Sequence, residues 1–96
     1  HNYTKAISIY NKLLLEKYKP AELNYIIGQI YFDIKKYKKS ISFFKASALL
    51  RDDAWWMPKL LLNSAISLEN TNDIDSAASF YSILIEKYPK SKEALE

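Results

Sequence analysis

The sequence predicts an all-α fold in which antiparallel helix pairs stack into a solenoid of about five to six helices. Two observations predict it. A short pattern of small and apolar residues recurs along the chain at a regular period, with prolines between the helical segments. The composition, with 49% hydrophobic residues, 26% charged residues and one Gly among 96 residues, is typical of a helix-rich globular domain.

The repeat becomes visible when the chain is aligned with itself. The segment at 5–10 recurs at 39–44 and again at 76–81, and its small second residue recurs after 34 and then after 37 residues. A period of 34 residues is typical of paired antiparallel helices that stack in a solenoid. We expect the three additional residues to fall in the connection at 51–57.

Prolines set the limits of the helices. Pro20, Pro58 and Pro89 each lie between apolar-periodic segments, where proline opens a helix or closes the preceding one. We expect Ser91 to be the N-cap of a sixth helix that begins near residue 91. The five preceding helices are expected at 2–18, 21–34, 37–50, 57–70 and 74–88.

These helices are expected to form one domain over 1–96, as a fragment of a longer array. It would comprise a partial repeat at 1–20, repeats at 21–52 and 53–89, and the start of a further helix at 90–96.

Small residues are expected where the second and third helices meet. The single Gly of the chain, Gly28, stands inside a helix, where it costs about 0.8–1 kcal/mol relative to Ala, so it indicates a close backbone contact. Ala65 and Ala77 should repeat this contact in the next pair. The residues expected to face one another are Ile27, Gly28 and Tyr31 on one helix and Ser40, Phe44 and Ser47 on the other.

The long connection carries two adjacent tryptophans. Trp55 and Trp56 would point about 100° apart on a helix, so one can enter the core while the other meets solvent or a partner. We predict that at least one of them packs in the core, and an exposed interface anchor is the alternative.

Acidic pairs stand beside two predicted helix starts. Asp52–Asp53 and Asp73–Asp75 carry carboxylates that acid–base or metal chemistry needs, but at these places they cap free amides and complement the helix dipole. The chain has no Cys and one His, His1, so it offers no zinc ligand set and no activated nucleophile. We predict that the chain is not an enzyme and has no cofactor and no metal.

Charge and hydropathy narrow the class of partner. The net charge is +3, and all but one of the 14 basic residues are Lys, which argues against a nucleic-acid partner because such surfaces also use Arg. No apolar run is long enough to span a membrane. A cluster of lysines that contains no acidic residue is predicted to be a solvated face. The alternative is that it binds an anionic partner or a lipid surface. Its members are Lys35, Lys36, Lys38, Lys39 and Lys45.

The segment 25–32, followed by Tyr37, Ser40, Phe44 and Ser47, resembles the tetratricopeptide repeat (TPR) signature. In that signature a Leu-Gly pair, a Tyr, a small residue, an aromatic residue and another small residue recur at fixed offsets. The chain departs from it at Asp52, where Pro often closes the repeat, at Ser40 for the usual Ala, and at Ser64-Ala65 for Leu-Gly. The resemblance implies a right-handed superhelical solenoid that acts as a non-catalytic protein–protein interaction scaffold.

A narrower resemblance lies in Glu86–Ala94, in Lys17–Glu22 and in the long second connection. These segments look like the C-terminal TPR domain of the YbgF-type Tol-Pal coordinator proteins. The likeness implies a periplasmic protein that coordinates cell division and outer-membrane constriction with peptidoglycan synthesis. The implied partner is a Tol protein or a septal peptidoglycan synthase.

Two alternatives to this role stay open. One is a TPR module of an outer-membrane assembly or secretion lipoprotein, since similar Tyr-Pro-x-Ser-x-x-Ala endings occur there. The other is a cytoplasmic regulatory TPR domain. The fragment is expected to be monomeric, and the full-length protein to oligomerise through an upstream coiled coil.

The geometry of a helix-pair solenoid indicates where a partner binds. The first helix of each pair lines the concave side, so its residues that do not face the second helix are available to a ligand, such as a peptide segment or helix. Alternatively, Tyr25, Phe32, Leu62 and Ile66 only pack against neighbouring repeats. The expected groove residues are Glu22, Tyr25, Gln29, Phe32, Asp33 and Lys36 in one repeat and Lys59, Leu62, Ile66, Glu69 and Asn70 in the next.

Overall fold

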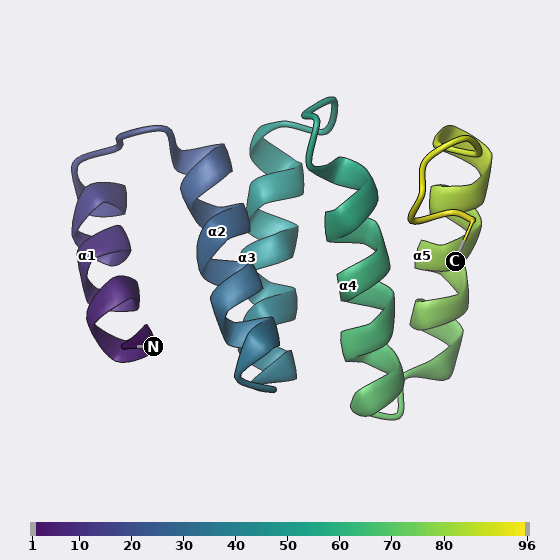
Figure 1. The fold of residues 1–96 in the computed structure, drawn as a ribbon, viewed down its shortest axis with the longest axis horizontal. Helices are drawn as coiled ribbons and strands as arrows, with labels where there is room; N and C mark the ends of the chain where they lie inside the picture. The colour runs from purple at the N-terminus through teal and green to yellow at the C-terminus, as the bar shows by residue number, and fades with distance from the viewer. Residues whose placement is uncertain (1, 96) are drawn as a thin grey trace.

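The computed structural model describes residues 2–95 as five α-helices, with no strand among them. The helices lie side by side in chain order and alternate in direction, as Figure 1 shows from α1 in purple to α5 in green. This confirms the predicted all-α helix-pair fold. His1, the single histidine of the sequence, lies outside the described residues. The helices are α1 (Tyr3–Leu15), α2 (Pro20–Asp33), α3 (Tyr37–Leu50), α4 (Met57–Asn70) and α5 (Ile74–Lys87).

Each helix pair is joined by one turn, and the two turns are of the same kind. After α2, the Lys36 N–H donates to the Tyr31 carbonyl at 2.8 Å across Lys35. After α4, the Asp73 N–H donates to the Leu68 carbonyl at 2.9 Å in the same way. This left-handed closure satisfies carbonyls at the end of the helix and reverses the chain within three residues. The pairs α2–α3 and α4–α5 are therefore equivalent helical hairpins.

The first helix is shorter than predicted. It ends at Leu15 instead of residue 18, because Lys17 takes a left-handed conformation with φ of 58° and the Tyr18 N–H donates to the Leu13 carbonyl at 3.1 Å. The same closing motif that ends α2 and α4 thus ends α1. The other four helices agree with the predicted limits to within one residue.

The segment after α5 is a turn instead of the expected sixth helix. Ser91 makes the predicted cap, since its Oγ accepts from the Ala94 N–H at 3.1 Å while donating to the Tyr88 carbonyl at 2.8 Å. Beyond this cap, the Leu95 N–H donates to the Ser91 carbonyl at 3.3 Å. One such bond does not offset the cost of nucleating a helix, so residues 89–95 remain a turn within the described part of the chain.

The α2–α3 hairpin has the predicted close approach. The buried Ser40 Oγ donates to the Gly28 carbonyl at 2.9 Å, and a Cβ on Gly28 would lie 2.6 Å from Cδ1 of the fully buried Phe44. Tyr31 also packs across this hairpin, where its ring stacks on that of Phe43 of α3 with centroids 5.5 Å apart.

The second hairpin also buries its small residues. Ala65 and Ala77 are both buried, and Ala77 packs with Ile41 and Leu68 in a small core of their own. The first turn of α5 also behaves as predicted, since Asp73 caps it. Its Oδ1 accepts from the Ser76 N–H at 3.3 Å.

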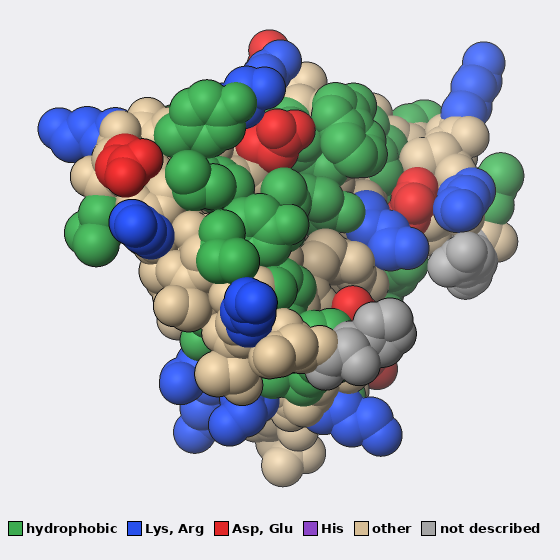
Figure 2. All heavy atoms as spheres, turned by 60° about the vertical axis from the view of Figure 1, so that its left-hand side comes forward, with side chains coloured by type: hydrophobic (Ala, Val, Ile, Leu, Met, Phe, Trp, Pro, Cys, Tyr) green, Lys and Arg blue, Asp and Glu red, His purple; other side chains and the backbone are tan. Residues whose placement is uncertain are grey.

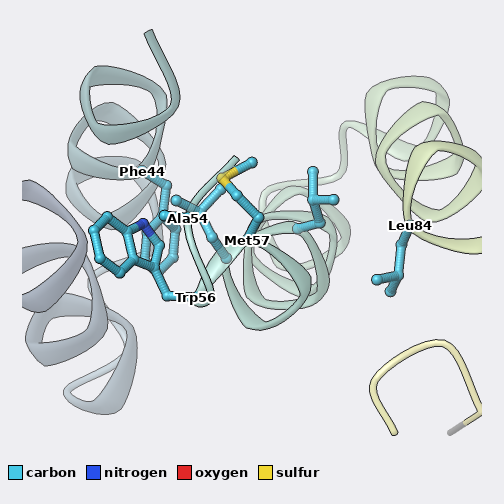
Figure 3. Packing of buried hydrophobic residues seen from close by; sticks show 7 residues of the cluster. Phe44, Ala54, Trp56, Met57 and Leu84 are labelled. Atoms are coloured by element: carbon cyan, nitrogen blue, oxygen red, sulfur yellow. The ribbon is translucent and has the colours of Figure 1, made fainter. Parts of the chain in front are cut away.

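The connection at 51–56 completes the main core (Figure 3). Trp56 is only 3% exposed and lies beside Phe44, whereas Trp55 is 77% exposed. The prediction that at least one tryptophan enters the core is confirmed. The Trp56 Nε1–H donates to Ser47 Oγ at 3.2 Å, and Ser47 Oγ donates to the Ala21 carbonyl at 2.8 Å, so one hydroxyl links α2, α3 and the connection.

The predicted capping role of the other acidic pair is wrong. α4 begins after Trp56 without a side-chain cap, and Asp53 instead accepts a hydrogen bond from Arg51 Nε at 3.1 Å. The cause is the length of the connection, which places both acids three or more residues before the helix starts.

Among the described helices, none combines the length and the apolar content that a membrane crossing requires.

Candidate protein-binding groove

The predicted groove residues lie on α2 and α4, the first helices of the two hairpins, which contact each other directly. None of the eleven is fully buried. Lys36 lies just beyond α2, where it is the N-cap of α3. Glu22, Tyr25, Gln29, Phe32, Leu62 and Ile66 are half-buried, while Asp33, Lys36, Lys59, Glu69 and Asn70 are exposed.

Tyr25 belongs to an aromatic wall at one end of these helices. Its ring stacks on Trp56, with centroids 5.6 Å apart and an angle of 14° between the ring planes. The exposed Trp55 lies edge-on to it at 6.3 Å, and Phe44 lies behind it at 6.1 Å. Tyr25 therefore combines a packing role on one side with partial exposure on the other, and aromatic groups of this kind contribute strongly to interfaces.

A hollow opens at the same end of the groove. Its volume is about 440 Å³, and Glu22, Arg51, Trp55 and Trp56 are among the residues that line it. The guanidinium of Arg51 lies 5.9 Å from the Trp56 ring, where it is held against the aromatic face. The hollow thus offers apolar rings flanked by the Glu22 carboxylate and by two cations, Lys19 and Arg51.

An amide pair joins the two helices near the middle of the groove. Asn63 Nδ2 donates to Gln29 Oε1, which fixes the orientation of the half-buried Gln29 amide. Asn63 is buried and was not predicted. The signal was present, because Asn63 takes the place that the apolar Ile26 holds 37 residues earlier, and a polar residue there needs a partner.

Two predicted residues of the second repeat make contacts within their own hairpin. Glu69 accepts a hydrogen bond from the Tyr81 hydroxyl of α5. Burial and this bond raise the pKa of Tyr81 to about 12. Asn70 Nδ2 donates to the Ile66 carbonyl at 2.9 Å, one turn earlier in the same helix. The structure therefore brings Tyr25, Gln29 and their neighbours together but directs Glu69 towards α5.

The C-terminal turn contributes charge to the groove. Burial raises the pKa of Tyr25, and the carboxylates of Glu93 and Asp33 raise it further. Glu93 was not predicted as a groove residue, because its segment was expected to be a helix. Ala94 of the same turn packs against the main core, and the Tyr88 hydroxyl donates to the Asp52 carbonyl at 3.5 Å. The turn is thereby attached to both the core and the 51–56 connection.

Comparison with known protein families identifies the two hairpins separately. A tetratricopeptide repeat model matches residues 21–53, and another tetratricopeptide repeat model matches residues 59–91. Together they cover about two thirds of the chain, and each match covers one hairpin apart from the first one or two residues of its first helix. Comparison with curated proteins and with solved structures finds no significant match.

Proposed function

Because the chain belongs to the tetratricopeptide repeat family, we propose that its groove binds an extended segment or a helix of a partner protein. Repeats of this family are typically non-catalytic protein-interaction modules. The chain would act as a scaffold, and the residues along α2 and α4 would provide the binding surface.

The aromatic wall beside the hollow is the observation that carries this proposal. Tyr25 and Trp55 leave apolar surface accessible next to a hollow of about 440 Å³, which suits one apolar side chain of a partner. Trp56 contacts both of these rings and holds them in place, so binding would order few additional side chains.

Polar groups along the groove would orient a bound segment and select among partners. The amide of Gln29, oriented by Asn63, suits hydrogen bonds to the backbone of a bound segment. The exposed charges Asp33 and Lys59 lie on α2 and α4 respectively and favour a partner with complementary charges.

We further propose that the partner belongs to the bacterial cell envelope and that the chain is periplasmic. The support is the likeness of Glu86–Ala94 and Lys17–Glu22 to the Tol-Pal coordinator proteins. The proposed partner is a Tol protein or a septal peptidoglycan synthase, in the coordination of cell division and outer-membrane constriction. An outer-membrane assembly or secretion lipoprotein is the second proposal, because the Tyr88, Ser91 and Ala94 pattern fits it equally.

The test of the groove uses its exposed charges. Tyr25 and Phe32 both contact the main core, so their replacement by Ala would confound binding with packing. Asp33→Lys combined with Lys59→Glu keeps the net charge and removes no core contact. The matched control is Asp75→Lys combined with Lys87→Glu, both exposed on α5.

The measurement is a pull-down from a bacterial envelope extract with the three proteins. We expect a Tol protein or septal synthase to be recovered by the parent chain and the α5 control, and to be lost with the groove variant. Recovery of outer-membrane assembly components would favour the second proposal. Equal recovery by all three proteins would contradict the groove assignment.

The isolated chain is proposed to be a monomer. Exposed apolar side chains on its outer helices, such as Ile9 on α1 and Ile85 on α5, give it a tendency to associate end to end at high concentration. Sedimentation equilibrium should give the mass of one chain, 11.2 kDa, at micromolar concentration. A constant dimer mass would contradict this proposal.

A further inference from the structure

A basic hollow lies at the opposite end of the hairpins from Trp55. Its volume is about 380 Å³. Figure 2 shows Lys and Arg side chains gathered along the lower edge of the molecule, the end at which Figure 1 places the α2–α3 and α4–α5 turns. We name it the lysine hollow, and it is lined by Lys35, Lys36, Tyr37, Lys38, Lys39 and Thr71.

Among the described residues, none of the four ammonium groups of the lysine hollow forms an ion pair. All four lysines are exposed, and the ion pair found within residues 2–95 joins Arg51 and Asp53 at the other end of α3. Lys39 Nζ lies 5.4 Å from the centroid of the Tyr31 ring, which positions the cation without neutralising it. Asp73, on the neighbouring turn, accepts from the Ser76 N–H and does not line the hollow.

The fold itself does not require lysine at these positions, as the equivalent α4–α5 turn shows. There the left-handed position is Asn72, with φ of 65°, and Asp75 stands in the first turn of α5. The α2–α3 turn has the same geometry but places Lys35, with φ of 63°, and Lys38 at these positions.

These lysines oppose the stability of their own hairpin. Asn suits the left-handed conformation better than Lys, and acidic side chains near a helix N-terminus are favourable where cations are unfavourable. Lys also takes the left-handed position after α1, at Lys17, so the departure that marks the α2–α3 hairpin is Lys38 in the first turn of α3, where α5 has Asp75. Such a departure is expected at a functional site.

We propose that the lysine hollow binds an acidic segment of a partner protein, whose Asp and Glu carboxylates enter among the four ammonium groups. Complementary charge is the basis of the recognition. The hollow contains no Arg, the residue that gives bidentate contacts to phosphates, so its chemistry favours carboxylates over nucleic acid. This site shares Lys36 with the proposed groove and none of its other residues.

The test transfers the residues of the α4–α5 turn to the lysine hollow. Lys35→Asn combined with Lys38→Asp leaves Lys36 in place, so the groove is untouched. The probe is a capped hexaglutamate peptide, with capped hexaglutamine as the uncharged control, and binding is followed by NMR shifts of backbone amides. We expect hexaglutamate alone to shift the amides of Lys38, Lys39 and Thr71, and salt to weaken this binding.

The double variant is expected to lose at least about tenfold in affinity for hexaglutamate. Its melting temperature should be equal to or higher than that of the parent chain, because the replacements follow local preference. Loss of binding would then not result from unfolding.

A matched control keeps the same change in charge. Lys45→Asn combined with Lys5→Asp replaces two exposed lysines outside the lysine hollow, one on α3 and one in the first turn of α1. This control should bind hexaglutamate within about twofold of the parent chain. An equal loss in both variants would mean that net charge alone attracts the peptide, and would overturn the proposal. So would shifts at the lysine hollow with phosphatidylglycerol vesicles or an oligonucleotide but not with hexaglutamate.

Discussion

At the scale of single residues, the close approach of α2 and α3 depends on the missing side chain of Gly28. We predict that Gly28→Ala lowers the free energy of unfolding by about 1–3 kcal/mol, although Ala favours a helix. The reason is that the new Cβ would lie 2.6 Å and 2.7 Å from two carbons of the Phe44 ring. Urea denaturation followed by circular dichroism measures the change. Unaltered stability would mean that the Phe44 ring can shift without cost.

Two buried serines provide a matched comparison. Ser40 Oγ donates to the Gly28 carbonyl, whereas Ser67 Oγ is buried without a hydrogen-bond partner among the described residues. We expect Ser40→Ala to lower the free energy of unfolding by about 1 kcal/mol and Ser67→Ala to leave it equal or higher. The comparison uses the same denaturation experiment. An equal loss in both variants would indicate that Ser67 has a bond to water or to backbone.

The tyrosine on α5 gives a pH-dependent prediction. The pKa of Tyr81 is raised from 10.0 to about 12, so the folded state holds this proton more tightly than the unfolded state. Its contribution to stability is complete below pH 10 and is lost as the pH rises through about 12. The difference in unfolding free energy between the parent chain and Tyr81→Phe should shrink over this range. Glu69→Gln should lower the pKa, as measured by tyrosinate absorbance, and an unchanged value would exclude Glu69 as a cause.

At the scale of elements, the 51–56 connection uses its two tryptophans differently. We predict that Trp56→Phe lowers the free energy of unfolding by about 1–3 kcal/mol, because Ser47 loses the indole donor and the core loses volume. Trp55→Phe should change it by less than about 0.5 kcal/mol, because that ring is mostly in solvent. Both are measured by thermal unfolding. Similar losses in the two variants would contradict the separate roles of these neighbours.

At the scale of the whole molecule, stability should decrease towards α1. This helix has no buried residue and packs only against α2, whereas α2, α3 and α4 surround the main core. Hydrogen–deuterium exchange should therefore be faster for the amides of α1 than for those of α2 or α4. Equal protection along the chain would indicate that the array opens as one unit.

Prediction from sequence was most successful where local patterns decide the structure. The number and limits of the helices at 20–33, 37–50, 57–70 and 74–87 follow from proline positions and the repeat, which act within a few residues. The contact of Gly28 with Ser40 and Phe44 was also predictable, because small residues recur at the same place in each hairpin. The candidate groove could be located on α2 and α4 for the same reason, since the repeat fixes which helix comes first in each pair.

The sequence by itself therefore determined the all-α repeat architecture, because period and turn chemistry are encoded along the chain. The tertiary structure alone decided which tryptophan is buried, that Tyr31 stacks on Phe43, and that Asn63 bonds Gln29. It also placed Thr71 beside four lysines. These contacts join residues of different elements, or depend on the orientation of neighbouring side chains. They are set by how the helices cross and pack, which spacing along the chain does not specify.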